Sequence, residues 1–311
     1  MSRPSSIRVG LVAGTAILLT TALVPPAGAR VATAEGTAAA CTMDVGSVTA
    51  AGDHTYRRIT AGAPPTIATV ANRVGTGIYP PGQVGLSTSF DNETYESGET
   101  RVAGWVIQGG ALYRSVYLLD SAGHLSGSPE LRRVGGGWTN FKLVEEAEWA
   151  LVQGGGLLRI SEYGLTNDGL LVRWRNIGEV WRRNGAGAGF EAVKTMALIS
   201  KTEKYDTFLA NTRGGALYTI RISTAVPPTF EVKKVRTSTW QAFETLLAVK
   251  CGLSGTMLLG IDKDTSSGYV YAVGHANGLS TVIRGLGKVQ GTFPDPVDFR
   301  WGLEFDPLNG E

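Results

Sequence analysis

The chain has 311 residues, of which 43% are hydrophobic and 18% charged, and its formal net charge is +2. This composition is that of a globular protein large enough to bury a substantial core. The near-neutral balance gives no electrostatic reason to expect a nucleic acid or an anionic membrane surface as partner.

Residues 1–34 have the order of a secretory signal peptide. Arg3 and Arg8 precede an apolar stretch over residues 9–24, and the small-residue sequence PPAGA follows at 25–29. Because this apolar stretch is short for a membrane span and two prolines end it, we expect a cleaved signal and not an anchor. Cleavage is expected near residue 29 or 34, and an uncleaved N-terminal anchor is the alternative.

A short linker over 35–40 and a single domain over 41–311 are predicted to follow. No other segment is apolar enough to span a membrane, so we expect the mature protein to be extracellular and secreted. The domain contains two cysteines, Cys41 and Cys251. A pair of cysteines in an exported chain favours a disulfide over two free thiols, which remain the alternative.

The sequence GGALY occurs at residues 109–113 and again at 214–218. Both copies lie between β-prone runs, which predicts a β-hairpin with a glycine-containing turn. Related segments extend this pattern along the chain, at 48–56, 105–113, 150–158, 208–218 and 258–271.

A second motif has the same period. The aromatic residues Trp138, Phe190, Trp240 and Phe293 each precede a predicted strand, at spacings of 52, 50 and 53 residues. Two different motifs with one period of about fifty residues indicate a repeated structural unit.

Each unit is predicted to contain four short antiparallel strands. In one of them the β-prone runs are Phe141–Glu146, Trp149–Gln153, Leu157–Ser161 and Leu170–Arg175. Four strands in about fifty residues are typical of a β-propeller blade. The sequence therefore predicts an all-β fold.

The two ends of the domain are predicted to complete one blade together. Residues 43–50, 54–59 and 67–74 supply three strands, and the surplus strand 297–305 would supply the fourth and close the ring. Further blades are expected near 83–136, 139–183, 190–236 and 242–288, which gives a five-bladed propeller. In such a ring Cys41 and Cys251 fall on one face of neighbouring blades. Asp91–Glu99 is predicted to be a mobile polar insertion.

These motifs resemble the tachylectin-2-like family of five-bladed propeller lectins. The resemblance is carried by Gly137-Trp138-Thr139-Asn140-Phe141 and Gly110-Ala111-Leu112-Tyr113, and it covers residues 41–311. It implies a carbohydrate-binding lectin with equivalent sites between blades for N-acetylated amino sugars. Phe190 and Leu158 depart from the pattern, so some sites are expected to be inactive.

A sugar site needs an aromatic platform and a few rigid polar groups. Each aromatic candidate has a second interpretation as a buried core residue between blades. The candidate sugar-binding residues are Trp138, Asn140, Tyr113, Trp240, Tyr218, Tyr271, Gln108, Gln153 and Asn211.

Catalytic and metal sites are not predicted. Glycosidases need two carboxylates together, and the acidic residues of the predicted inner strands, Glu145 and Glu146 among them, occupy no repeated position and are interpreted as solvated. His54, His124 and His275 lack metal-ligand spacing, so neither a metal nor a cofactor is expected.

The sequence therefore predicts a secreted lectin that binds cell-surface or extracellular glycans and is not an enzyme. The alternative is a protein-interaction propeller that serves as a subunit of a secreted complex, and a glycosidase is the less favoured third possibility.

Overall fold

The computed structural model describes residues 40–70, 75–150, 159–177, 180–302 and 307–311. The chain divides into two units, Met1–Ala38 and Ala39–Glu311, and all described residues belong to the second. The predicted signal peptide lies outside the described residues. Among the residues that are described, none forms a helix long and apolar enough to cross a membrane.

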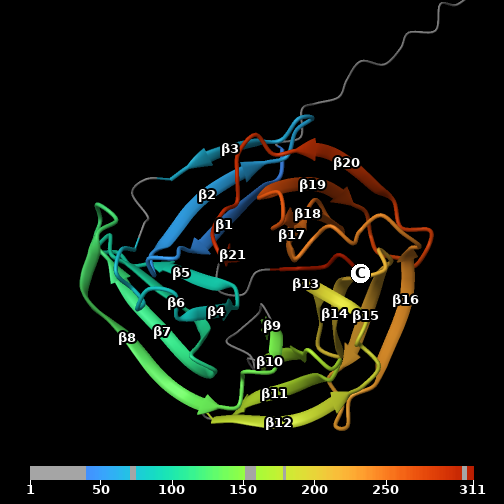
Figure 1. Cartoon of the computed structure of the whole chain (residues 1–311), viewed down its shortest axis with the longest axis horizontal. Helices are drawn as coiled ribbons and strands as arrows, with labels where there is room; N and C mark the ends of the chain where they lie inside the picture. The colour runs from blue at the N-terminus through green and yellow to red at the C-terminus, as the bar shows by residue number, and fades with distance from the viewer. Residues whose placement is uncertain (1–39, 71–74, 151–158, 178–179, 303–306) are drawn as a thin grey trace, which may run out of the picture. The chain divides into compact units, whose positions relative to one another are not determined.

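The described part of the chain is all-β and consists largely of four-stranded antiparallel sheets in chain order (Figure 1). The third sheet contains β9 (Phe141–Trp149), β10 (Arg159–Thr166), β11 (Leu171–Ile177) and β12 (Val180–Gly187). The fourth sheet contains β13 (Val193–Lys201), β14 (Tyr205–Thr212), β15 (Leu217–Ser223) and β16 (Phe230–Arg236). The fifth sheet contains β17 (Thr245–Cys251), β18 (Gly255–Asp262), β19 (Ser267–Val273) and β20 (Ile283–Lys288).

The first sheet joins the two ends of this unit. It contains β1 (Thr42–Val48), β2 (His54–Thr60), β3 (Thr66–Thr69) and β21 (Val297–Gly302). β21 pairs antiparallel with β1 in the register Val48↔Val297 to Val45↔Arg300. The C-terminal strand thus lies beside the strand with which the sequence predicted it to pair.

The second sheet contains β4 (Val84–Ser87), β5 (Phe90–Thr94), β6 (Thr100–Gln108), β7 (Ala111–Leu119) and β8 (Leu125–Gly136). Both β4 and β5 pair with β6, and β5 also makes a two-residue parallel pairing with β21. The prediction of a polar loop at 91–99 is therefore wrong over its first half, because Asp91–Thr94 forms ladder pairs with β6.

One hydrogen bond recurs in five units of the described chain. The main-chain N–H of a buried aromatic residue donates to the carbonyl of a turn residue with positive φ, at N···O distances of 2.9–3.1 Å. The pairs are Tyr79–Gly52, Trp138–Gly110, Phe190–Gly169, Trp240–Gly215 and Phe293–Ser266. The positive φ explains why glycine occupies four of these turns.

This recurrence corrects one alignment made from the sequence. The turn that matches GGALY in the third sheet lies between β10 and β11, at Gly169, and not at 150–158. Trp149 ends β9, and residues 151–158, which include most of the expected strand at Trp149–Gln153, lie outside the described residues. A strand position predicted from local similarity shifted here because Gly-rich segments match one another easily.

The first strands of the five units contact one another in the cyclic order β4, β9, β13, β17, β21 and back to β4. Together they line a cavity of about 200 Å³ whose charged residues are Lys142, Glu145, Glu244, Lys263 and Asp298. Figure 1 shows β8, β12, β16 and β20, the last strands, on the outside of the same unit.

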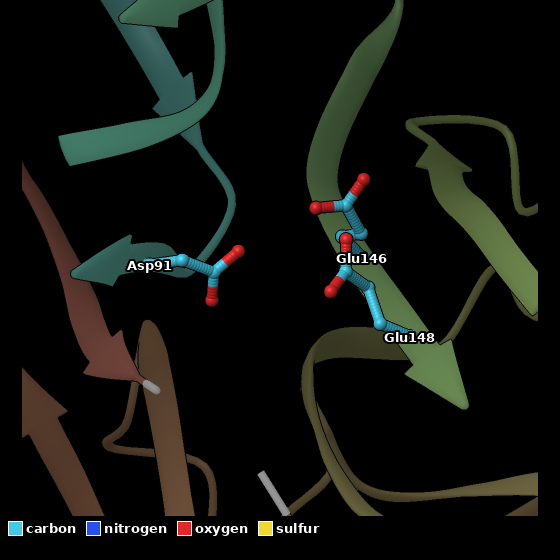
Figure 2. Close-up of side chains that lie close together, drawn as sticks. All are labelled: Asp91, Glu146 and Glu148. Atoms are coloured by element: carbon cyan, nitrogen blue, oxygen red, sulfur yellow. The ribbon is translucent and has the colours of Figure 1, made fainter. Parts of the chain in front are cut away.

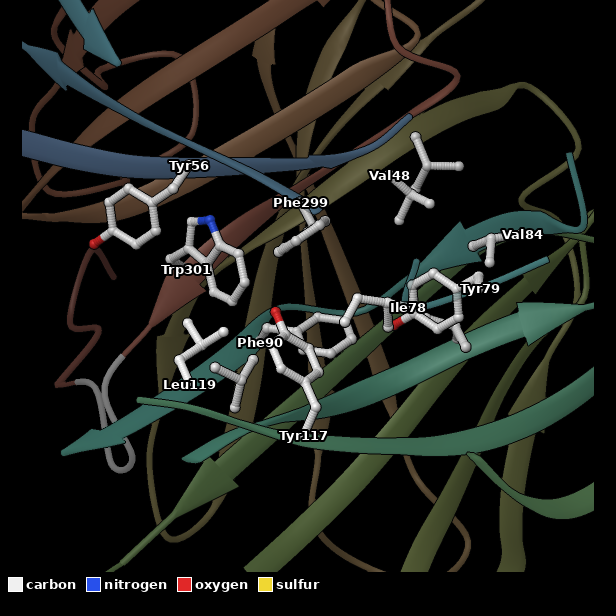
Figure 3. Close-up of a cluster of buried hydrophobic side chains, with 13 residues drawn as sticks. Val48, Tyr56, Ile78, Tyr79, Val84, Phe90, Tyr117, Leu119, Phe299 and Trp301 are labelled. Carbon is white, nitrogen blue, oxygen red and sulfur yellow. The ribbon is translucent and has the colours of Figure 1, made fainter. Parts of the chain in front are cut away.

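Large apolar side chains fill the spaces between the sheets. Figure 3 shows the cluster between the first and second sheets, where Phe90, Phe299 and Trp301 pack together with ring centroids 4.8–5.9 Å apart. At the junction of the first and fifth sheets Cys41 and Cys251 form a disulfide with a Cα–Cα distance of 5.6 Å, which confirms the predicted pairing.

Candidate functional site

Trp138 and Trp240, two of the predicted sugar platforms, are core residues in the structure. They are 8% and 5% exposed, and each packs against the sheet that follows it. The Trp138 ring lies 4.8 Å from that of Trp174, and the Trp240 ring lies 4.7 Å from that of Tyr271. Their position favours the core interpretation, because most of each ring face is already covered.

The three predicted tyrosines, Tyr113, Tyr218 and Tyr271, lie on β7, β15 and β19 and are half-buried. Burial raises the pKa of Tyr271, whose ring contacts Trp240. The Lys234 ammonium lies 5.7 Å from the Tyr218 ring centroid, and Tyr113 packs against the cluster between the first two sheets. The structure does not bring these three residues together, since each belongs to a different sheet.

The asparagine and glutamine residues predicted as sugar-binding candidates have different surroundings in the structure. Asn211 is fully buried, donates to the carbonyls of Trp240 and Phe243 at 2.7 and 2.9 Å, and accepts from the N–H of Thr195. Its role is therefore to hold the turn around Trp240. Asn140 donates to Asp168 at 3.0 Å on the surface.

The other two amides are Gln108 and Gln153. The Gln108 Oε1 atom is buried and has no hydrogen-bond partner among the described residues. Gln153 lies outside the described residues.

Two of the sequence motifs do meet at a cavity of about 290 Å³ between the second and third sheets. The GGALY turn supplies Gly109 and Gly110, and the following junction supplies Trp138, Thr139 and Phe141. The remaining lining residues are Gln83, Gly85, Leu86 and Ile107. This junction cavity is mainly apolar and offers few polar side chains to a ligand.

A larger cavity of about 440 Å³ lies along the same interface, and we call it the charged pocket. Its walls come from β6, β7 and β8 of the second sheet and from β9, β10 and β11 of the third. It is lined by Arg101, Trp105, Arg114, Val116, Glu130, Arg132, Glu146, Glu148, Ile160 and Asn176.

Trp105 forms the aromatic wall of the charged pocket. Its Nε1 donates to Glu146 Oε2 at 2.6 Å, and the Arg114 guanidinium lies 4.9 Å from its ring centroid. The edge of Trp181 packs against it at 5.0 Å. Trp105, Arg114 and Glu146 are thus held in fixed relative positions before any ligand arrives.

A further acidic residue, Glu162, lies on β10 beside Glu146 of β9. It pairs with Glu146 across the β9–β10 ladder, so both side chains point from the same face of the third sheet. Glu162 is 1% exposed, and neither of its carboxylate oxygens has a hydrogen-bond partner among the described residues. Burial and the nearby Glu146 raise its pKa well above the usual range.

The same effects act on Glu146. Burial and the neighbouring Glu148 raise its pKa well above the usual range, while Arg114 opposes the shift. The interpretation of Glu145 and Glu146 as solvated charges is therefore wrong, since both are half-buried and hydrogen-bonded. Carboxyl groups with strongly shifted pKa at a pocket are typical of functional sites.

Trp105, Arg114 and Glu146 are not among the sugar-binding candidates predicted from the sequence. Trp105 begins the segment 105–113, but these three residues do not recur at equivalent positions of the repeats. The alternation in Glu145-Glu146-Ala147-Glu148 was a usable signal, because a strand places Glu146 and Glu148 on one face. Which sheet would cover that face could not be read from the pattern.

No protein-family model and no curated protein matches this sequence. Among solved structures, it is similar to the alpha-L-arabinofuranosidase PaAbf62A from Podospora anserina in complex with cellotriose, at 10% identity and a TM-score of 0.47 over 75% of this chain and 84% of that chain. It is also similar to a variant of the Aleuria aurantia lectin in complex with Fucalpha1-6GlcNAc, at 10% identity and a TM-score of 0.47 over 84% and 85%. A variant of AofleA from Arthrobotrys oligospora matches at 10% identity and a TM-score of 0.42 over 81% and 90%. These similarities are too low to carry an argument about function, and the tachylectin-2-like family stays a prediction.

Proposed function

We propose that the protein binds carbohydrate in the charged pocket. The observation that carries this proposal is the convergence of Trp105, Arg114 and Glu146 on one cavity of about 440 Å³. A sugar presents an apolar ring face together with hydroxyls that both donate and accept hydrogen bonds. A guanidinium donates to a hydroxyl and a carboxylate accepts from one, so this group of residues matches the chemistry of adjacent hydroxyls.

The wider context of the proposal is a secreted, closed five-bladed propeller. The five turn–aromatic hydrogen bonds and the cyclic contacts of the first strands support five blades. The Cys41–Cys251 disulfide and the signal-like residues 1–34 support export to an oxidising compartment. A preference for N-acetylated amino sugars on cell-surface glycans follows only from the resemblance of the motifs to tachylectin-2-like lectins.

A glycoside hydrolase is the second candidate function. Glu146 and Glu162 are carboxyl groups whose pKa is raised, which a general acid needs, and further carboxylates lie beside them. A protein-interaction propeller in a secreted complex is the third, and no feature of the described residues favours it over sugar binding.

A glycan array probed with the secreted protein tests the proposal. We expect specific binding that Arg114→Gln weakens at least tenfold, because the sugar loses its main cationic donor. Arg133→Gln is the matched control, since Arg133 is exposed on β8 next to the pocket residue Arg132 but does not line the pocket. A blank array, or equal losses in both variants, would reject the charged pocket as a sugar site.

Mass spectrometry of the bound oligosaccharides separates a lectin from a hydrolase. We expect every oligosaccharide to be recovered intact. Fragments that appear with the native protein and not with Glu146→Gln would identify it as a hydrolase instead.

A further inference from the structure

The carboxylates of Asp91, Glu146 and Glu148 gather at the edge of the charged pocket. Asp91 comes from β5 of the second sheet, and the two glutamates come from β9 of the third. One oxygen from each lies within 4.8 Å of the others. Figure 2 shows Asp91 facing Glu146 and Glu148 across the gap between the two sheets.

An independent feature places a further carboxylate beside this cluster. Glu162 is buried on the same face as Glu146, and both of its oxygens are without a partner among the described residues. Arg114 is the cation that acts on both Glu146 and Glu162. A buried carboxylate without a partner is costly, and a cation bound beside it would offset that cost.

We propose that Asp91, Glu146 and Glu148 bind a calcium ion, with Glu162 contributing charge from the neighbouring strand β10. Ca²⁺ takes carboxylate oxygens at about 2.3–2.6 Å, so two ligands on opposite sides of the ion are about 4.6–5.2 Å apart. One oxygen from each of the three residues lies within 4.8 Å of the others, so all three can reach one calcium ion. Mg²⁺ demands near-ideal octahedral geometry and gives up its waters reluctantly, so it is a poorer match for three carboxylates that come from two sheets.

The ion would connect the second sheet to the third, because its ligands come from β5 and β9. It would also hold Glu146 in place, since that residue already accepts from Trp105. This site does not depend on sugar binding, although Glu146 and Glu148 also line the charged pocket.

Calorimetric titration of the full, chelator-treated protein with CaCl₂ at neutral pH tests the proposal. We expect one calcium per chain and a thermal midpoint that rises with calcium concentration, because a ligand bound only to the folded state stabilises it. Asp91→Asn and Glu148→Gln should each weaken calcium binding at least tenfold, and Glu162→Gln should weaken it by a smaller factor.

Glu130→Gln is the matched control, because Glu130 lines the same pocket but does not belong to the cluster. Arg114→Gln should leave calcium affinity undiminished while reducing sugar binding, so the two proposals fail separately. No binding heat and no thermal shift at 10 mM calcium would overturn the site. Equal losses in Glu130→Gln, or equal affinity for MgCl₂, would overturn it as well. If Asp91→Asn does not fold, Glu148→Gln alone decides the outcome.

Discussion

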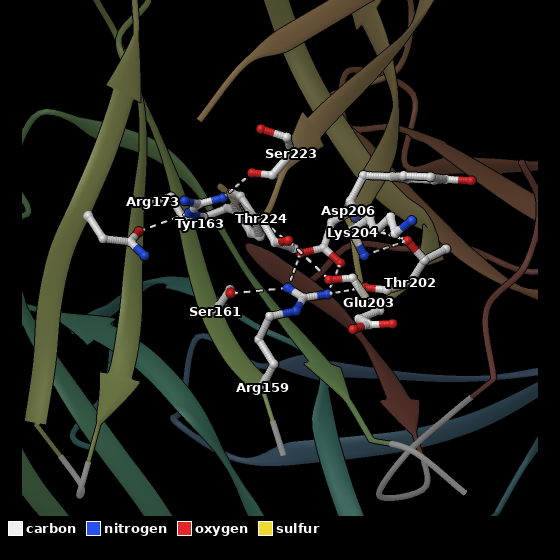
Figure 4. A network of polar contacts seen from close by, with 12 residues as sticks. Arg159, Ser161, Tyr163, Arg173, Thr202, Glu203, Lys204, Asp206, Ser223 and Thr224 are labelled. Carbon is white, nitrogen blue, oxygen red and sulfur yellow. Dashed lines mark hydrogen bonds and ion pairs between the residues drawn. The ribbon is translucent and has the colours of Figure 1, made fainter. Parts of the chain in front are cut away.

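The two faces of β10 carry two buried groups of charges that differ in how they are neutralised. Towards the fourth sheet, Arg159 pairs with Asp206, which also accepts from Tyr163 at 2.6 Å (Figure 4). Towards the second sheet, Glu162 pairs with no group among the described residues.

The first group is closed by the protein itself. Besides Asp206, the Arg159 guanidinium donates to Ser161 Oγ and to the carbonyl of Thr202. Charges that are paired and hydrogen-bonded in this way hold sheets together. The difference between the faces teaches that one strand can carry a buried charge with a counter-charge, Arg159, and a buried acid without a partner among the described residues, Glu162.

The largest expected effect comes from breaking the closed group. Asp206→Asn leaves the Arg159 guanidinium, 4% exposed, without its counter-charge, which should cost about 3–5 kcal/mol of unfolding free energy. Urea denaturation measures this loss. The double variant Arg159→Met/Asp206→Leu should recover most of it, and a double variant as unstable as the single one would contradict the explanation.

The next largest effect comes from removing aromatic side chains that pack between neighbouring sheets. Trp138→Ala and Phe190→Ala should each cost about 3 kcal/mol, because both side chains are at most 8% exposed and pack between sheets. Thermal unfolding measures both. A stable Trp138→Ala protein that has lost sugar binding would show instead that Trp138 is a ligand platform, as the sequence suggested.

Replacing Glu162 should change the unfolding free energy in the opposite direction from breaking the Arg159–Asp206 pair. Glu162→Met removes a buried charge without a partner and supplies an apolar side chain to a tryptophan-rich interface, so we expect a gain of about 1 kcal/mol. Urea denaturation in the presence of chelator is the measurement. A loss similar to that of Asp206→Asn would mean that Glu162 has a structural role.

The smallest effect concerns a buried neutral group, His54, which lies among aromatic rings of the first two sheets. Burial lowers its pKa from 6.5 to about 3, so below pH 6.5 the unfolded state binds more protons than the folded state. Its contribution to stability is therefore lost as the pH falls from 6.5 towards 3, by about 1 kcal/mol at pH 5.5.

Between pH 7 and 5, the unfolding free energy should fall less in His54→Gln than in the native protein. The exposed His124→Gln is the control. The titratable groups that face His54, Tyr79 and Tyr117, stay neutral over this range because burial raises the pKa of both. Burial raises the pKa of Asp298 to about 6, which acts in the opposite sense and is common to all three proteins. Identical slopes of unfolding free energy against pH in the native protein and in His54→Gln would contradict the lowered pKa of His54.

The sequence by itself determined the all-β class, the period of about fifty residues, the pairing of the C-terminal strand with the first strand, and the Cys41–Cys251 disulfide. These features follow from local patterns and from repetition. Strand propensity and glycine turns are local to one hairpin, so they can be recognised in a short segment. A repeated unit also predicts that each copy packs against the next copy along the chain. The third unit was misaligned because its Gly-rich segment at 150–158 resembles in sequence the turn that the structure places at Gly169.

Only the tertiary structure decided which polar residues remain available to a ligand. The side chain of Asn211 is hydrogen-bonded to the carbonyls around Trp240, and Arg159 is ion-paired with Asp206. In the sequence both residues are as polar as Arg114 and Glu146, which line the charged pocket. The carboxylate of Asp91 meets those of Glu146 and Glu148 only because two sheets pack face to face. Whether a side chain finds a partner depends on the facing sheet, and no local pattern in a strand records what the facing sheet supplies.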